Sequence, residues 1–332
     1  MINLFITGGL GYIATHILHT LNKNYNILIY DNLVNSDNNN INYIKTLNLH
    51  ITIITTKYEL EKVICDFKPD VFLHMASLKY VNESCEEPIM YYDNNISEML
   101  YFIKQVIIKA KCKKIIFSSS ATVYKSKNDQ VDETTDLQNL YNFDSVYGKT
   151  KCICENILMD IQKKYNLEII ILRYFNPIGY LNNEIMKLFI NRIENTLMSN
   201  ILTAYSKNKK FNIYGNKYDT IDGTPIRDFI HIMDLATAHS EFITKSIKPC
   251  IKIYNVGTGI GTTVKQIIDE FNNITNPPLK YGFTSNRKGD IPISFSSNVL
   301  IIKDTSWKPK YSIKDIVENV SMISKYLFEN NY

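Results

Sequence analysis

TGGLGYIA, at residues 7–14, is the stretch of sequence that decides the fold of this chain. An apolar run of strand length, residues 3–6, precedes the stretch, and apolar residues at helical spacing follow it. Gly8, Gly11 and Ala14 are small where the chain must turn tightly, approach a ligand and pack a helix on a strand. We therefore expect a strand, a glycine loop and a helix whose first N–H groups face phosphate oxygens.

The next run of strand length, residues 26–30, leads into Asp31, 20 residues after Gly11. A carboxylate at this point binds the ribose hydroxyls of an adenosine and repels a 2′-phosphate, so NAD is expected rather than NADP. The predicted cofactor-binding residues of this region are Gly8, Gly11, Tyr12, Ile13, Asp31 and Asn32.

Short apolar runs and helix-length segments alternate through the rest of the first half. Further strands are expected at residues 52–54, 71–74, 114–118 and 169–173. Helices are expected at residues 13–21, 60–67, 96–110 and 150–165. This alternation predicts right-handed crossovers and a Rossmann-type doubly wound parallel α/β sheet. The Asn-rich stretch at residues 35–42 is expected to be a surface loop.

Glycines and prolines break this rhythm after about residue 175. We expect an NAD-binding domain over residues 1–176 and a smaller, mixed α/β C-terminal substrate domain over residues 177–332. Segments around residues 227–245 are expected to return to the first domain. Helices are expected at residues 234–245, 263–271 and 313–327.

The composition argues against several classes of protein. Lys and Arg number 37 against 33 Asp and Glu, and no basic stripe appears, so no nucleic-acid partner is expected. The six cysteines form no C-x-x-C pair, which indicates reduced thiols in a reducing compartment. The chain shows no signal-peptide pattern and no apolar run of membrane length. We expect a cytoplasmic protein without a membrane partner, and no metal site, because His16 and His19 have no third ligand near them.

Ser120 ends the strand expected in the middle of the sheet, and Tyr147 and Lys151 lie one helical turn apart. A lysine ammonium and a positively charged nicotinamide both favour the phenolate form of Tyr147, which can then accept a proton. Ser120 can relay or orient that proton. The same Tyr-x-x-x-Lys spacing recurs at Tyr58/Lys62 and Tyr205/Lys209. Only the pair at 147 and 151 follows the Ser120 strand within the dinucleotide half.

Taken together, these motifs resemble the UDP-glucose 4-epimerases, a family of the extended short-chain dehydrogenase/reductases. The resemblance runs from residue 2 to about residue 320, in order and with nearly constant spacing. The motifs that carry it are TGGLGYIATH, YDNL, HMASLKYVNES, YYDNN, FSSSATVY, YGKTK, LRYFNPIG, DGTPIRDFIHIMDLA, YNVGTG and GDIP.

The resemblance implies an isomerase that inverts C4 of a UDP-hexose with tightly bound NAD and no net redox change. Tyr147 would take the proton of the sugar 4-hydroxyl while hydride passes to the nicotinamide, which leaves a 4-keto sugar. The sugar would then turn and take the hydride back on its other face. The helices at residues 96–110 and 150–165 would pair across a two-fold axis, so a homodimer is expected.

The resemblance also assigns residues to cofactor and substrate. Further cofactor contacts would be Lys79, Asn94, Ser118, Tyr147, Lys151 and Tyr174. Substrate contacts would be Lys79, Ser120, Thr122, Tyr147, Asn176, Asn195, Tyr214, Arg227, Arg287, Asp290 and Ser294. Among them, Arg227 and Arg287 would hold phosphate oxygens through paired N–H groups, and Asp290 would hold ribose hydroxyls.

Departures from the family pattern bear on affinity and specificity. Residues 53–57 (IITTK) lack the acid that usually reads the adenine amino group, which puts NAD affinity in question. Lys125 replaces an expected glycine, and Asn195 is followed by Thr196 rather than by a second asparagine. Ser294 is small where glucose-specific members carry a bulky tyrosine, so activity on UDP-N-acetylglucosamine and UDP-N-acetylgalactosamine is also expected.

Three other functions stay open at this point. A sugar-nucleotide 4,6-dehydratase would need an Asp-Glu pair after the strand-end threonine, where this chain has Ala121-Thr122-Val123. A UDP-glucuronate epimerase would need a cation for the 6-carboxylate, and none stands out. A non-catalytic nucleotide-sugar sensor is disfavoured because Ser120, Tyr147 and Lys151 occur together.

Overall fold

The computed structural model describes residues 1–125, 129–189, 196–245, 248–286 and 291–329. The chain divides into two compact units. Unit 1 comprises Met1–Lys125, Thr135–Tyr174 and Ala236–Tyr254; unit 2 comprises Ser126–Thr134, Phe175–Leu235 and Asn255–Tyr332. Within the described residues, no helix is long and apolar enough to cross a membrane.

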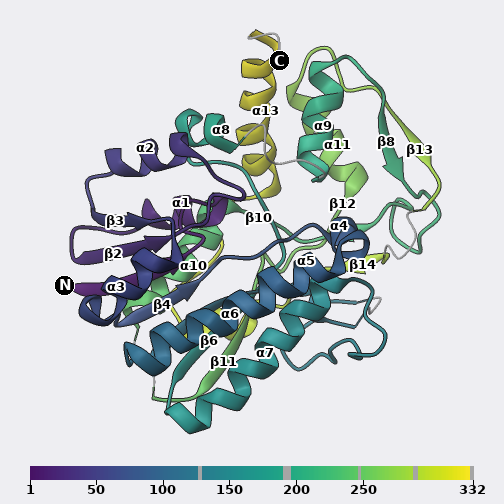
Figure 1. Ribbon diagram of the computed structural model, residues 1–332. Helices are drawn as coiled ribbons and strands as arrows, with labels where there is room; N and C mark the ends of the chain where they lie inside the picture. The colour runs from purple at the N-terminus through teal and green to yellow at the C-terminus, as the bar shows by residue number, and fades with distance from the viewer. Residues whose placement is uncertain (126–128, 190–195, 246–247, 287–290, 330–332) are drawn as a thin grey trace. The chain divides into compact units, whose positions relative to one another are not determined.

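Unit 1 is built on a seven-stranded sheet with the order β11-β6-β5-β4-β1-β2-β3. Figure 1 labels β2, β3, β4, β6 and β11 of this sheet. Its strands are β1 (Ile2–Thr7), β2 (Tyr25–Tyr30), β3 (His50–Ile54), β4 (Val71–His74), β5 (Lys114–Ser120), β6 (Glu168–Tyr174) and β11 (Ile251–Val256). The six strands from β3 to β6 pair in parallel. This order confirms the Rossmann-type doubly wound sheet, in which ligands bind beyond the carboxyl ends of the strands.

Helices that belong wholly to unit 1 connect these strands. They are α1 (Tyr12–Leu18), α2 (Asn38–Thr46), α3 (Lys57–Phe67), α4 (Val81–Glu86), α5 (Pro88–Tyr92), α6 (Glu98–Phe102) and α7 (Val146–Tyr165). The helix expected at residues 96–110 is present, but π-helical turns at Asp93–Ser97 and Ile103–Lys109 flank α6. One hydrophobic core joins the sheet to three helical elements, which are α3, α7 and the segment around α6. In this core Phe5 stacks on Phe72, with ring centroids 5.4 Å apart.

The Asn-rich stretch at residues 35–42 is not a loop throughout, so that expectation was wrong. α2 begins within it because the Asp37 carboxylate accepts hydrogen bonds from the N–H groups of Asn39 and Asn40, and the Asn40 side chain bonds back to the Asp37 N–H. Such a capping box satisfies donors that the first helical turn leaves unpaired. The buried Ile44 then anchors the helix.

Unit 2 is a mixture of short strands and helices, as expected. Its described residues form three small sheets. The first pairs β7 (Asn176–Ile178) with β10 (Phe229–His231), and the second pairs β8 (Phe211–Tyr214) with β13 (Tyr281–Thr284). The third has the order β12 (Thr262–Thr263), β9 (Ile226–Arg227) and β14 (Ile293–Ser294). Its helices include α8 (Asn183–Phe189), α9 (Leu197–Ser206), α11 (Val264–Ile274), α12 (Val299–Asp304) and α13 (Ile313–Glu329). α10 (Ile232–Thr244) begins in unit 2 and continues in unit 1.

Candidate active site

The glycine loop after β1 is packed so closely that side chains would not fit. Gly8 has φ +68°, and a Cβ there would lie 2.8 Å from the backbone nitrogen of Ala76. A Cβ on Gly9, which the sequence pattern did not single out, would lie 2.6 Å from Cγ2 of Ile29. Gly11 is the N-cap of α1 and supplies no side-chain cap. The loop therefore keeps a bare backbone at the start of α1, as a pyrophosphate site requires.

Asp31 lies directly beside this loop. Its Oδ2 accepts a hydrogen bond from the Leu10 N–H at 3.1 Å, and its Oδ1 accepts from the Ser36 hydroxyl at 2.7 Å and the Leu33 N–H at 3.0 Å. The side chain of the next residue, Asn32, accepts from the Val34 N–H at 3.3 Å. The carboxylate is thus held against the glycine loop at the end of β2, and the two features fit a dinucleotide.

Ser120, Tyr147 and Lys151 come together at the carboxyl end of β5. The Ser120 Oγ accepts from the Thr122 N–H at 3.2 Å and the Thr122 hydroxyl at 3.0 Å, and Ser120 is hydrogen-bonded to the Tyr147 side chain. Lys151 Nζ donates to the Ser118 carbonyl at 2.7 Å and lies 5.9 Å from the centre of the Tyr147 ring. Because the Ser120 oxygen already accepts two hydrogen bonds, its own proton can be donated to Tyr147.

Burial governs the protonation of this group. It lowers the pKa of the Lys151 amine to about 8, against the opposing effect of Cys154 and Glu155. It raises the pKa of the Tyr147 phenol above the ordinary value, although the hydrogen bond from Ser120 acts in the other direction. Burial and the nearby Lys151 charge lower the pKa of His74 to about 3, so that imidazole stays neutral. The protein's own groups therefore keep Tyr147 protonated at neutral pH, and a further positive charge is needed to favour phenolate.

Three other predicted cofactor residues lie in unit 1. Lys79 is exposed and lies 5.7 Å from the ring of Tyr80, and the Asn94 side chain accepts from the Leu78 N–H at 3.2 Å. Tyr174 is buried and is hydrogen-bonded to the side chains of Ser118 and His239. Tyr174 thus supports the strand end in this structure.

Asn95 is a residue that sequence reasoning missed. Its side chain accepts from the Leu78 N–H at 2.9 Å and donates to the Leu78 carbonyl at 3.1 Å. It also donates to the Thr150 hydroxyl at 3.0 Å, which ties the loop after β4 to the helix that carries Tyr147. The Asn94-Asn95 pair in the YYDNN motif was the available signal.

In unit 2, the structure brings two predicted substrate residues onto paired strands and a third, Asn176 of β7, into contact with the residue that follows Arg227. Arg227 of β9 and Ser294 of β14 are register partners. The backbone and side-chain N–H groups of Asn176 both donate to the Asp228 carbonyl, at 3.0 and 2.9 Å. Asn176, Tyr214 and the pair Arg227 and Ser294 therefore belong to three separate sheets, with Tyr214 at the end of β8. The predicted residues Asn195, Arg287 and Asp290 lie outside the described residues.

Asp228, also missed from sequence, organises these strands. Its fully buried carboxylate accepts from the N–H and hydroxyl of Thr258 at 2.8 and 2.6 Å and from the Gly259 N–H at 3.1 Å. It accepts as well from the N–H and hydroxyl of Ser296 at 3.1 and 2.6 Å. A buried charge with this many donors holds two loops beside Arg227. The only sequence signal for Asp228 was its place in the RDFIH motif, directly after Arg227.

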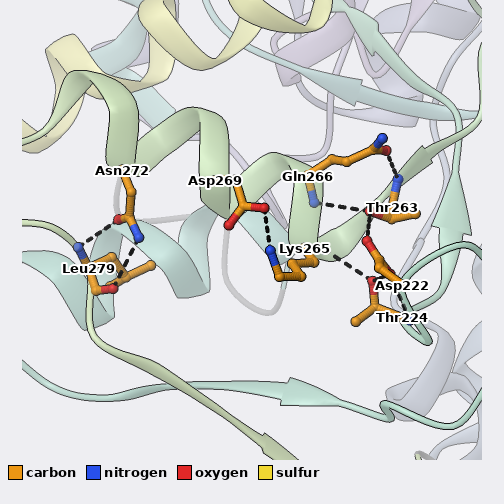
Figure 2. Close-up of polar contacts among 8 residues, drawn as sticks. All are labelled: Asp222, Thr224, Thr263, Lys265, Gln266, Asp269, Asn272 and Leu279. Atoms are coloured by element: carbon orange, nitrogen blue, oxygen red, sulfur yellow. Dashed lines mark hydrogen bonds and ion pairs between the residues drawn. The ribbon is translucent and has the colours of Figure 1, made fainter.

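The segment before β9 is fixed to α11 by a second carboxylate (Figure 2). Asp222 accepts from the N–H and hydroxyl of Thr224 at 2.9 and 2.6 Å and from the Thr263 hydroxyl at 2.5 Å. Thr263 in turn caps α11 in a capping box with Gln266. These contacts set the course of the chain into Arg227.

A doubly wound sheet with this glycine loop, Asp31 and the Ser120–Tyr147–Lys151 cluster defines a dinucleotide-binding α/β protein of the short-chain dehydrogenase/reductase type. The chain belongs to the NAD dependent epimerase/dehydratase family, whose model matches residues 4–257. This confirms the expected family, and the description of that family agrees with the expected cofactor, NAD.

Individual relatives cover nearly the whole chain. UDP-glucose 4-epimerase 4 of Oryza sativa subsp. japonica is 35% identical over 327 residues, which covers 94% of this chain and 87% of the relative. The solved UDP-glucose-4-epimerase of Stenotrophomonas maltophila, with bound NAD and formylated UDP-arabinopyranose, superimposes with a TM-score of 0.90 at 28% identity over 99% and 100% of the two chains. The UDP-Glc/GlcNAc 4-epimerase of Campylobacter jejuni gives a TM-score of 0.81 at 28% identity over 98% and 100%.

Proposed function

We propose that this chain is a UDP-hexose 4-epimerase that interconverts UDP-glucose and UDP-galactose and also acts on their N-acetylated forms. The observation that carries the proposal is the Ser120–Tyr147–Lys151 cluster at the carboxyl end of β5. A phenol hydrogen-bonded to a serine, with a buried amine one helical turn away, is suited to exchange a proton with a sugar hydroxyl.

The residues of unit 1 divide the work between binding and proton transfer. The bare backbone at Gly8 and Gly11 and the carboxylate of Asp31 would hold NAD, together with Tyr12, Ile13 and Asn32. When bound, NAD supplies the hydride acceptor and the positive charge that favours the Tyr147 phenolate. Tyr147 takes the proton from the 4-hydroxyl as hydride leaves C4, and returns it after the 4-keto sugar has presented its other face.

Unit 1 is accordingly proposed as the NAD-binding domain and unit 2 as the UDP-sugar-binding domain. Asn176, Tyr214 and Arg227 would contact the substrate, with Arg227 on the phosphates, where a planar guanidinium gives paired hydrogen bonds. Asn195, Arg287 and Asp290 complete the proposed set. Lys79, Asn94, Ser118, Thr122 and Tyr174 would line the cofactor and sugar in unit 1.

Acceptance of N-acetylated sugars rests on Ser294. Its small side chain stands beside Arg227 on the paired strand, where a bulky residue would occupy the space of a 2-acetamido group. The Campylobacter jejuni neighbour is described as acting on both kinds of sugar, which supports the same breadth here.

We also propose a cytoplasmic homodimer. Large apolar side chains are exposed along α5 to α7 of unit 1: Ile89, Met90, Leu100, Ile108 and Met159. Exposed apolar surface of this kind is suited to cover itself in a second copy. Light scattering at micromolar protein should give twice the chain mass, and a monomer mass would contradict this point.

The test of the activity is direct. The purified chain is incubated with UDP-galactose and, separately, with UDP-N-acetylgalactosamine, and the products are separated by chromatography. Formation of the glucose and N-acetylglucosamine epimers is expected. A folded, NAD-loaded chain that converts neither sugar would defeat the proposal.

A further inference from the structure

A buried junction of three side chains lies behind the proposed catalytic centre. Glu155 follows Lys151 by one turn of α7, and its Oε1 accepts from the Ser119 hydroxyl at 2.5 Å and from Arg173 Nε at 3.0 Å. Its Oε2 accepts from Arg173 Nη2 at 2.6 Å. Ser119 and Arg173 are register partners on β5 and β6. One carboxylate therefore joins α7 to two adjacent strands.

The strand residue held by this junction separates two groups of the catalytic centre. Ser119 stands between Ser118, whose carbonyl accepts from Lys151, and Ser120, which bonds Tyr147. A change in how β5 lies on α7 would therefore disturb both contacts together. The guanidinium of Arg173 also lies over the Tyr124 ring, with its carbon 4.7 Å from the ring centre.

The energetics of buried ion pairs argue that the junction serves more than stability. Glu155 and Arg173 are 1% and 2% exposed, and a pair so deeply desolvated is often no more stable than apolar residues of the same volume. The same two strands carry a second buried pair at their other end, where Lys114 meets Glu168 at 2.8 Å. That pair lies at the start of both strands, away from Ser120.

We propose that Glu155 and Arg173 are positioning residues, which fix β5 against α7 so that Ser120 meets Tyr147 and the Ser118 carbonyl meets Lys151. The inference rests on the proposed epimerase function. Glu155 has a second effect, because its negative charge favours the ammonium form of Lys151. Other titratable groups of the described residues that face this amine include Cys154 and Tyr147 on α7 and the neutral His74 of β4. Arg173 moderates the effect by pairing with the carboxylate.

The decisive comparison is Glu155→Gln against Glu168→Gln. Each variant leaves one buried cation without its carboxylate, and both should lose stability in urea unfolding. With UDP-galactose, E155Q should lose about ten- to a hundredfold in kcat with little change in KM, as expected for a misplaced catalytic group. E168Q should keep the kcat of the unaltered chain. Ser119→Ala, which removes one hydrogen bond of the junction, should lose kcat to a smaller degree.

A double variant separates positioning from stability. Glu155→Gln combined with Arg173→Met removes the unpaired charge, so stability should recover while kcat stays low. A kcat that recovers together with stability, or an equal kcat for E155Q and E168Q, would overturn the inference.

The titration of Lys151 can be measured without any enzymatic turnover, so it tests this inference separately from the proposed function. The titration of the Lys151 amine is followed by NMR, from the pH dependence of its Cε chemical shift, in the unaltered chain and in E155Q. The inflection should move to lower pH in E155Q, because the amine loses a favourable charge; an unchanged inflection refutes the electrostatic part. If the unaltered chain fails to epimerise, the proposed function fails, and the inflection still decides whether Glu155 acts on Lys151.

Discussion

The two units position their functional side chains by different means. In unit 1, the paired parallel strands β5 and β6 end beside each other, so backbone pairing places Ser118, Ser120 and Tyr174 along the strands, and one carboxylate, Glu155, joins both strands to α7. In unit 2, strands of two to four residues carry Asn176, Tyr214, Arg227 and Ser294, and side-chain carboxylates hold the strands and loops together. Long strands specify position through the ladder, whereas short strands need a buried anchor.

Tyr147→Phe should give the largest effect. It tests whether a Tyr-x-x-x-Lys pair is catalytic only where it lies beside the carboxyl end of β5. Turnover of UDP-galactose should fall by about 10²- to 10⁴-fold, because only the proton acceptor is removed. The matched control is Tyr58→Phe, since Tyr58 has a lysine at the same spacing, with Lys62 Nζ 3.8 Å from its ring centre, but is 70% exposed on α3. Circular dichroism should show both variants folded. Equal activity of the two would remove Tyr147 from the reaction.

Asp228→Asn tests the anchor of unit 2. An amide has one oxygen in place of two, so it cannot accept all five hydrogen bonds, and the free energy of unfolding should fall by about 2–4 kcal/mol. KM for UDP-galactose should rise more than kcat falls, because Arg227 and Asn176 lose their support. Asp222→Asn is the graded control, with three hydrogen bonds in a less buried setting. A larger effect at Asp222 than at Asp228 would contradict this order.

Lys151 links the chemistry of unit 1 to its stability. The pKa of this buried amine is lowered from 10.5 to about 8, so the folded chain releases the proton before the unfolded chain does. Stability should therefore rise with pH between about 8 and 10.5, whereas turnover that needs the ammonium should fall as pH rises through about 8. Lys151→Met should abolish that rise in stability with pH. The free energy of unfolding of this variant at pH 7 should be higher by about 1–3 kcal/mol, and its turnover should be lost. Urea unfolding at several pH values measures how the free energy of unfolding changes with pH in the unaltered chain and in K151M. The same pH dependence in both proteins would refute the argument that burial lowers the pKa of Lys151.

Most elements of unit 1 could be predicted from the sequence because the patterns that indicate them are local. Strand-length apolar runs, the glycine loop and Asp31 each depend on a few adjacent residues, and the order of strands then follows from crossover rules. β11 was missed because its sequence, IKIYNV, is short and follows the break in rhythm after residue 175. α2 was missed because its start depends on the cap at Asp37 within a polar stretch.

The contacts that support the functional residues of the two units could not be predicted from the sequence, for a different reason. Asp228 binds donors 30 and 68 residues away, and Glu155 binds partners 36 and 18 residues away on two strands. No local pattern distinguishes such a carboxylate from one on the surface. The pairing of Arg227 with Ser294 likewise depends on strand register across unit 2.

Ser294→Tyr should give the smallest effect and tests whether a side chain in unit 2 selects the sugar. A phenol ring in place of the hydroxyl should fill space needed by a 2-acetamido group, so kcat/KM for UDP-N-acetylgalactosamine should fall by about tenfold or more. The value for UDP-galactose should stay close to that of the unaltered chain, because its 2-hydroxyl is small. Ser294→Ala is the control, since it keeps the space and should keep both activities. A parallel loss of both sugars in S294Y would show that residue 294 supports the strand beside Arg227 and leaves the choice of sugar to other side chains.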